Sequence, residues 1–148
     1  MEKNNKGMTL IVKTITRLTV GLIILFGIYI VAHGHLTPGG GFAGGVIIAL
    51  SFIHIMLAFG KEVAIKKVSK KVAKFFESIG AIIFISLAIT GIISGYYFLN
   101  FLYKGEPYTL FSAGLVPLYN FAICFKVAAG LFLIFGVMVF FKIHREGE

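Results

Sequence analysis

The sequence contains no aspartate and no tryptophan, a single cysteine and only three prolines among its 148 residues. Without aspartate, and with its few glutamates scattered, the chain offers no carboxylate pair and no Ser/His/Asp set for catalysis. The lone Cys124 excludes a disulfide within the chain and a cysteine cluster that holds a metal. We therefore expect no enzyme in its own right, no cofactor and no metal centre.

Charged residues are also scarce, at 14% of the chain, whereas soluble domains carry about a quarter. Hydrophobic residues make up 58%, with a mean hydropathy of +0.95. A bilayer core of about 30 Å needs about 20 helical residues to cross it. Four apolar runs meet this need and predict an all-α, single-domain integral membrane protein. The expected transmembrane helices cover approximately 14–32, 42–60, 76–102 and 116–141.

The placement of basic residues predicts the orientation of these four helices. Twelve of the fourteen lysines and arginines lie before residue 18, between the second and third runs, or after the fourth run, whereas the two opposite loops hold only Lys104. By the positive-inside rule, both termini and the 61–74 loop are cytoplasmic in a multi-pass protein of the cell membrane. This loop is either a solvated segment or a basic amphipathic stretch on anionic lipid. Nucleic-acid binding is excluded, because the net charge of +8 flanks apolar runs.

A glycine-rich segment between the first two runs is the most unusual stretch of the chain. It predicts that the first helix ends before a proline, that the chain turns tightly, and that small residues line the next helix for close contact with a neighbour. Its G-x-G-x-x-G spacing is rejected as a dinucleotide fingerprint, because no strand precedes it. The residues expected to form the turn and contact face are Pro38, Gly39, Gly40, Gly41, Gly44 and Gly45, with a second small-residue face at Gly91 and Gly95.

Three histidines and one lysine are the polar residues of interest. His33 and His35 form only a weak metal pattern, so His35 is either a hydrogen-bonded loop residue or a proton-handling group. His54 in the second run is either bonded to a neighbouring helix or part of a proton path. Lys126 lies near the middle of the fourth run, where a cation costs about 3 kcal/mol on insertion scales.

A lysine at that depth needs an anion, a water-filled cavity or the loss of its proton. The one acid in a predicted span is Glu77, which is expected at the cytoplasmic start of the third helix and too far along the membrane normal for easy pairing. The counterpart of Lys126 is therefore expected on another subunit; the alternative is a structural helix from which the Lys126 side chain snorkels to the membrane surface. Asn120, almost two turns earlier, is expected to line the same path.

These residues resemble the signature of the MnhB/MrpB family of multisubunit Na+/H+ antiporter subunits. The likeness rests on residues 34–45 (GHLTPGGGFAGG), on Phe76-Glu77 and on Asn120 with Lys126, and it extends from about Leu18 to Phe141. The resemblance implies a four-helix subunit that does not transport ions alone. Its implied partners are other small Mrp-type subunits and a Complex I-like antiporter subunit, in an obligate hetero-oligomer. Similar modules occur in ferredoxin-linked membrane-bound hydrogenase and sulfur reductase complexes.

Three functions remain open at this point. The leading hypothesis is a non-catalytic subunit of a cation/proton exchange module, with Lys126, His35, His54, Asn120 and Glu77 near the ion path. The second is a structural spacer between ion-translocating subunits, for which the glycines matter and the polar residues do not. The third, a membrane enzyme or haem carrier, would require a bound prosthetic group.

Overall fold

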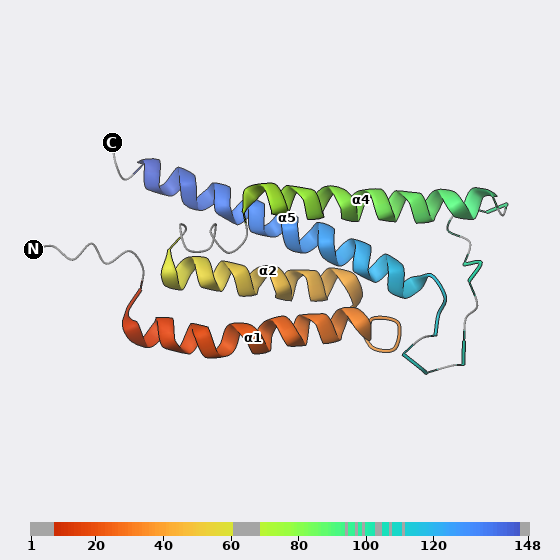
Figure 1. The fold of residues 1–148 in the computed structure, drawn as a ribbon, viewed down its shortest axis with the longest axis horizontal. Coiled ribbons are helices and arrows are strands. Elements are labelled where there is room, and N and C mark those ends of the chain that lie inside the picture. Colours follow the sequence, from red (N-terminus) through yellow and green to blue (C-terminus); the bar gives the residue numbers. More distant parts are fainter. Residues whose placement is uncertain are drawn as a thin grey trace, which may run out of the picture.

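The computed structural model describes residues 8–60, 69–93, 95–96, 98, 100–102, 105–106, 108–110 and 112–145, with side chains as far as residue 139. Four helices form the described chain (Figure 1). They are α1 (Leu10–Ala32), α2 (Gly40–Phe59), α4 (Lys70–Ile93) and α5 (Val116–Arg145). Each is long and apolar enough to cross a membrane, which confirms the predicted all-α membrane architecture.

The helices lie side by side in the order α1, α2, α5, α4 (Figure 1). Helix α5 contacts both α2 and α4, while α1 packs chiefly against α2. Helices α2 and α5 run parallel to each other, and α1 and α4 run in the opposite direction. We call the end with the α1–α2 turn and the start of α5 the turn end. The end with the start of α1 and the end of α5 is the terminal end.

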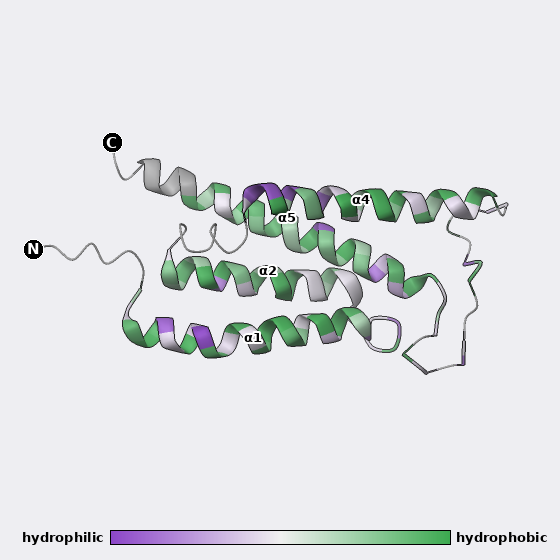
Figure 2. Cartoon of the chain, viewed as in Figure 1, coloured by the Kyte–Doolittle hydropathy of each residue, from purple (hydrophilic) through white to green (hydrophobic). Residues whose placement is uncertain are grey.

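Much of the apolar surface of this bundle is left uncovered by the chain itself. In the most apolar window of each helix, only 17% to 39% of the residues are buried, and α2 has the largest share. Figure 2 shows hydrophobic residues along most of each helix, with hydrophilic ones concentrated at the starts of α1 and α4. Lipid or other subunits must therefore cover the remaining apolar faces.

Glycines set the distances between neighbouring helices. A Cβ placed on Gly41 of α2 would overlap the backbone carbonyl of Asn120 on α5, and one on Gly45 would lie 3.0 Å from the Cys124 carbonyl oxygen. On the other side of α5, a Cβ on Gly80 of α4 would lie 2.6 Å from the Ala122 carbonyl oxygen. Small residues thus let α5 meet both neighbours almost backbone to backbone.

The third predicted helix occupies a different range from the expected 76–102. Helix α4 begins at Lys70, where Ser69 Oγ accepts a hydrogen bond of 3.2 Å from the Val72 N–H and caps the first turn. It ends at Ile93, because Gly95 has a φ of +101° and leaves the helical path. A Cβ on Gly95 would meet nothing within 4 Å, so Gly95 ends the helix and does not extend a contact face with the buried Gly91.

The other helices differ less from expectation. Helix α1 starts at Leu10 instead of near residue 14, α2 starts at Gly40 instead of 42, and α5 continues to Arg145 instead of ending near 141. Polar residues at the ends of these runs are helical, although hydropathy alone places them outside a span. Residues 61–68 of the basic loop lie outside the described part of the chain.

The glycine contact between α2 and α5 yields a direct test. We expect Gly41→Ala to lower the stability of the assembled complex by about 1–3 kcal/mol, because the new methyl group would overlap the Asn120 carbonyl. The midpoint of thermal dissociation of the purified complex measures this effect. Gly21→Ala is the matched control, since a Cβ there meets nothing within 4 Å. Equal stability of the two variants would contradict the close α2–α5 contact.

Candidate functional site

The turn between α1 and α2 is shaped by two glycines. Gly39 has a φ of +140° and Gly40 a φ of +73°, both in a region that side chains disfavour. Helix α2 has no side-chain cap of its own, which leaves its first N–H groups without partners within the helix. Asn120 of α5 supplies one, because its Oδ1 accepts a hydrogen bond of 3.2 Å from the Gly41 N–H. The same contact fixes the start of α2 against α5.

Two buried polar atoms near this turn have no hydrogen-bond partner among the described residues. The His35 Nε2–H donates to the Thr109 carbonyl at 3.2 Å, so Nδ1 is an acceptor whenever the ring is neutral, and this Nδ1 is buried without a partner among the described residues. The Asn120 Nδ2, a donor, is also buried and unsatisfied. It lies against Gly34, the residue before His35. The turn end therefore holds an unused acceptor and an unused donor in neighbouring positions.

Lys126 and Glu77 lie along the interface between α4 and α5. Gly80 packs against the Lys126 backbone, where a Cβ would lie 2.8 Å from its nitrogen. Glu77, one turn before Gly80, places Oε1 3.9 Å from the Cβ position of Gly130, which is one turn after Lys126. Glu77 and Lys126 are thus separated by about one helical turn along the helix axes.

This geometry corrects the expected separation of these two charges. Because α4 begins at Lys70, Glu77 lies two turns inside the helix and not at its start. The Lys126 side chain is exposed at the edge of the interface, and Glu77 is half-buried. Within the described residues, neither charge forms an ion pair at 4 Å or less. Two opposite charges therefore lie inside neighbouring spans without being paired.

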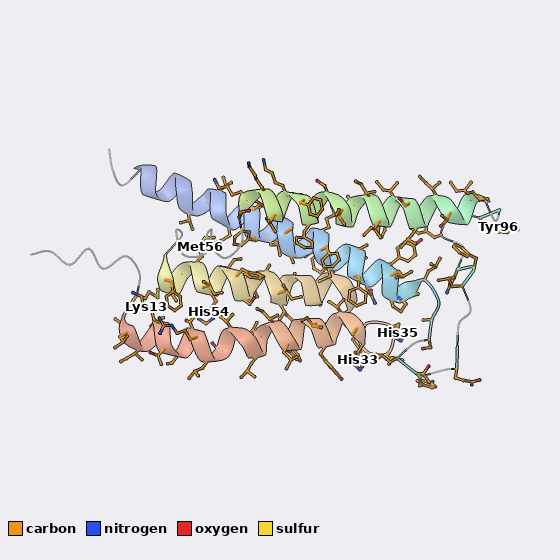
Figure 3. The ribbon with its side chains drawn as sticks, viewed as in Figure 1. Lys13, His33, His35, His54, Met56 and Tyr96 are labelled. Atoms are coloured by element: carbon orange, nitrogen blue, oxygen red, sulfur yellow. The ribbon has the colours of Figure 1, made fainter. Side chains whose placement is uncertain are left out.

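His54 is located at the other end of the α1–α2 hairpin from His33 and His35 (Figure 3). Its Nε2 lies 3.2 Å from Oγ1 of Thr16, a residue of α1 that is only 1% exposed. Arg17, on the next position of α1, lies over the Phe59 ring at 5.3 Å from its centroid. His54 thus lies within hydrogen-bonding distance of a neighbouring helix.

The predicted polar residues do not form a single cluster. His35 and Asn120 lie at the turn end, Glu77 and Lys126 lie midway along α4 and α5, and His54 faces α1 near the terminal end. Among the described residues, no group of three or more His, Cys, Asp or Glu side chains could hold a metal ion. His33 is engaged locally, since its ring stacks on Tyr29 with centroids 4.1 Å apart.

Sequence reasoning missed Asn100, which was expected inside the third helix. Its side chain lies outside α4 and holds the start of α5, donating to the Ala113 carbonyl at 2.9 Å and accepting from the Leu115 N–H at 3.0 Å. An asparagine at the end of an apolar run, followed by aromatic and glycine residues, was the available signal. Asn100 and Asn120 together fix the beginnings of α5 and α2.

Comparison with known families identifies the type of subunit. Residues 11–133 match the model of a domain related to the MnhB subunit of the Na+/H+ antiporter. The chain belongs to this family. It is a membrane protein, with four helices able to span the bilayer.

Individual relatives of this MnhB-family chain come from archaea and bacteria. An uncharacterized protein of Methanocaldococcus jannaschii, MJ1307, is 38% identical over 117 residues, which cover 74% of this chain and 44% of that protein. A candidate antiporter subunit of Staphylococcus haemolyticus, mnhB2, is 34% identical over 106 residues, which cover 72% of each chain. This chain therefore spans less than half of the archaeal relative and most of the bacterial one.

A solved structure shares the fold. A chain of the membrane-bound sulfane sulfur reductase, an archaeal respiratory membrane complex, superposes with a TM-score of 0.73 and 29% sequence identity. The match covers 93% of this chain and 63% of that one. The MnhB-family fold thus has a homologue within a respiratory membrane complex.

The polar contacts at the turn end predict opposite effects for two adjacent residues. We expect Asn120→Leu to cost about 1–3 kcal/mol, because it leaves the Gly41 N–H buried without an acceptor. Tyr119→Phe should be neutral or stabilising, because the Tyr119 hydroxyl is buried and has no partner in the part of the chain that the structure describes. Thermal dissociation of the assembled complex measures both. A large loss in Tyr119→Phe would instead show that a companion subunit bonds to this hydroxyl.

Proposed function

We propose that this chain is a non-catalytic subunit of a cation/proton exchange module, built into either an Mrp-type antiporter or a ferredoxin-linked respiratory complex. Membership of the MnhB family and the homologue in the sulfane sulfur reductase complex support this role. In the proposal the partners are other small Mrp-type subunits and a Complex I-like antiporter subunit. The uncovered apolar faces of the four helices agree with an obligate hetero-oligomer.

The proposed orientation places the terminal end in the cytoplasm. Lys13 and Arg17 lie near the start of α1, and three lysines lie in the first turns of α4, whereas the turn end has few cations in the sequence. The positive-inside rule then assigns the α1–α2 turn, with His35, to the opposite side of the membrane.

Lys126 is the observation that carries the functional proposal. It lies about ten residues into α5, near the middle of the span, and it has no ion-pair partner in the described chain. Such a cation is costly in hydrocarbon and is typically part of an ion or proton pathway. Because its side chain is exposed at the edge of the α4–α5 interface, it can reach a carboxylate or water supplied by a neighbouring subunit.

Glu77 gives the proposed site a means of coupling. A proton or sodium ion that binds the carboxylate neutralises it and weakens its attraction for the Lys126 ammonium group. When the bound proton or sodium ion leaves Glu77, the attraction returns. The position of the Lys126 side chain would therefore depend on whether the Glu77 carboxylate holds a proton or a sodium ion. His35 and Asn120 at the turn end, and His54 near the terminal end, offer further proton-handling groups outside this central pair.

A structural spacer is the second candidate. The close backbone contacts of α5 with α2 and α4 favour the spacer function, because tightly packed helices would hold neighbouring subunits at a fixed distance. The two functions differ in what they require of Lys126. The spacer needs the glycines and tolerates loss of the charge, while the exchange subunit needs both.

Replacement of Lys126 separates these two functions. We expect Lys126→Ala, in the assembled complex, to lower Na+/H+ exchange by about tenfold or more while the subunits still co-purify. Exchange is measured as proton movement out of acidified vesicles when sodium is added to the external medium. Lys71→Ala, which removes an exposed lysine near the start of α4, is the matched control and should exchange normally. Normal exchange in Lys126→Ala would leave the spacer as the function.

A double-mutant cycle tests whether Glu77 acts with Lys126. If the two charges work as a unit, Glu77→Gln combined with Lys126→Gln should exchange no more slowly than the slower single variant. Strictly additive losses would mean that each residue meets a different partner.

The subunits that co-purify with the native complex show whether the host complex is an antiporter or a reductase.

A further inference from the structure

The first turns of α4 form one wall of a pocket at the terminal half of the bundle. The pocket has a volume of about 210 Å³ and lies between α4, α5 and the end of α2. Its apolar lining comes from Met56 of α2 and from Phe132, Leu133, Gly136 and Val137 of α5. Lys70 and Lys74 are the polar side chains among its lining residues. The pocket therefore combines a hydrocarbon-like floor with two positive charges.

The helix geometry places both lysines at the same opening. Ser69 caps α4 and fixes its first turn, and residues four apart on a helix share a face. Lys71 lies on a different face and does not line the pocket. The first turn of α4 contains no acidic residue, and within the described chain neither Lys70 nor Lys74 has an ion-pair partner. As far as the described residues show, the opening thus carries two lysines without an ion-pair partner.

The pocket also lies at the depth where a membrane changes from headgroups to hydrocarbon. Lys70 is the first residue of a candidate span, so its ammonium group is at the level of the lipid headgroups. Phe132 of α5 is 4% exposed and lies deeper, where it packs with Met56 and Ala73. A ligand that fills this pocket must be anionic at one end and apolar at the other.

We propose that this pocket binds one anionic phospholipid. Its phosphate lies between the Lys70 and Lys74 ammonium groups, and one acyl chain lies on the apolar floor formed by Met56 and α5. Charge complementarity selects an anionic over a zwitterionic headgroup, and each lysine near an anionic headgroup contributes roughly fivefold in affinity. A free phosphate would leave the apolar floor uncovered, and a peptide carboxylate would find no hydrogen-bonding side chain beyond the lysines.

Photo-crosslinking in the assembled complex tests this site. The purified complex is mixed with phosphatidylglycerol that carries a diazirine in one acyl chain, and separately with the matching phosphatidylcholine probe. We expect phosphatidylglycerol to label residues 132–137 at least about fivefold more strongly, as located by mass spectrometry of peptides. The double variant Lys70→Gln/Lys74→Gln should lose this preference, whereas Lys71→Gln should keep it.

Each remaining outcome also decides the proposal. The labelling is repeated with excess inorganic phosphate. If phosphate leaves the labelling unchanged, the ligand is a lipid. If phosphate abolishes the labelling, the lipid site is overturned. Equal labelling by the two probes, or no labelling because a companion subunit fills the pocket, would overturn it as well. If the glutamine variant does not assemble, Lys70→Arg/Lys74→Arg keeps the charge and should keep the preference. Failure of this site would leave the proposed role of Lys126 untouched.

Discussion

The structure depends on the near contact of the α5 backbone with the backbones of α2 and α4. The hydrophobic effect supplies little attraction between helices that are already in lipid. Because Gly41 and Gly80 have no side chains, the helix backbones come close enough for van der Waals contact to hold the helices together instead. The polar groups of the site follow from this contact. Asn120 reaches the start of α2 because the two backbones touch there, and Glu77 reaches the level of Gly130 because Gly80 lets α4 approach Lys126.

The balance of charge and burial explains why the chain is not self-sufficient. A soluble helical bundle covers its apolar residues with its own helices, whereas α1 and α4 each bury only 17% of their most apolar window. Lipid can cover that surface, but it cannot neutralise a mid-span cation. In the proposed role, Lys126 and the His35 and Asn120 atoms, which lack partners among the described residues, are the positions where other molecules would complete this MnhB-family subunit.

The fold was largely predictable because four apolar runs in lipid have few alternatives to four helices. The limits of the third helix could not be predicted in this way. Hydropathy places Lys70 and Lys74 in a loop, although both are helical, and Gly95 ends α4 in the midst of apolar residues. The level of Glu77 relative to Lys126 depends on the axial offset of α4 along α5. That offset is set by tertiary contact at Gly80, and a single sequence does not specify it.

The parallel course of α2 and α5 has an electrostatic consequence. Neighbouring helices in a simple up-and-down hairpin cancel each other's dipoles, but these two begin at the same end. Each contributes a partial charge of about +0.5 there, and the fields add at the turn end. A cation at the turn end therefore meets repulsion between α2 and α5, and the negative ends of α1 and α4 on either side reduce it. At the same end α4 has its C-terminus, whose partial negative charge makes that flank of the turn end easier for positive charge to approach.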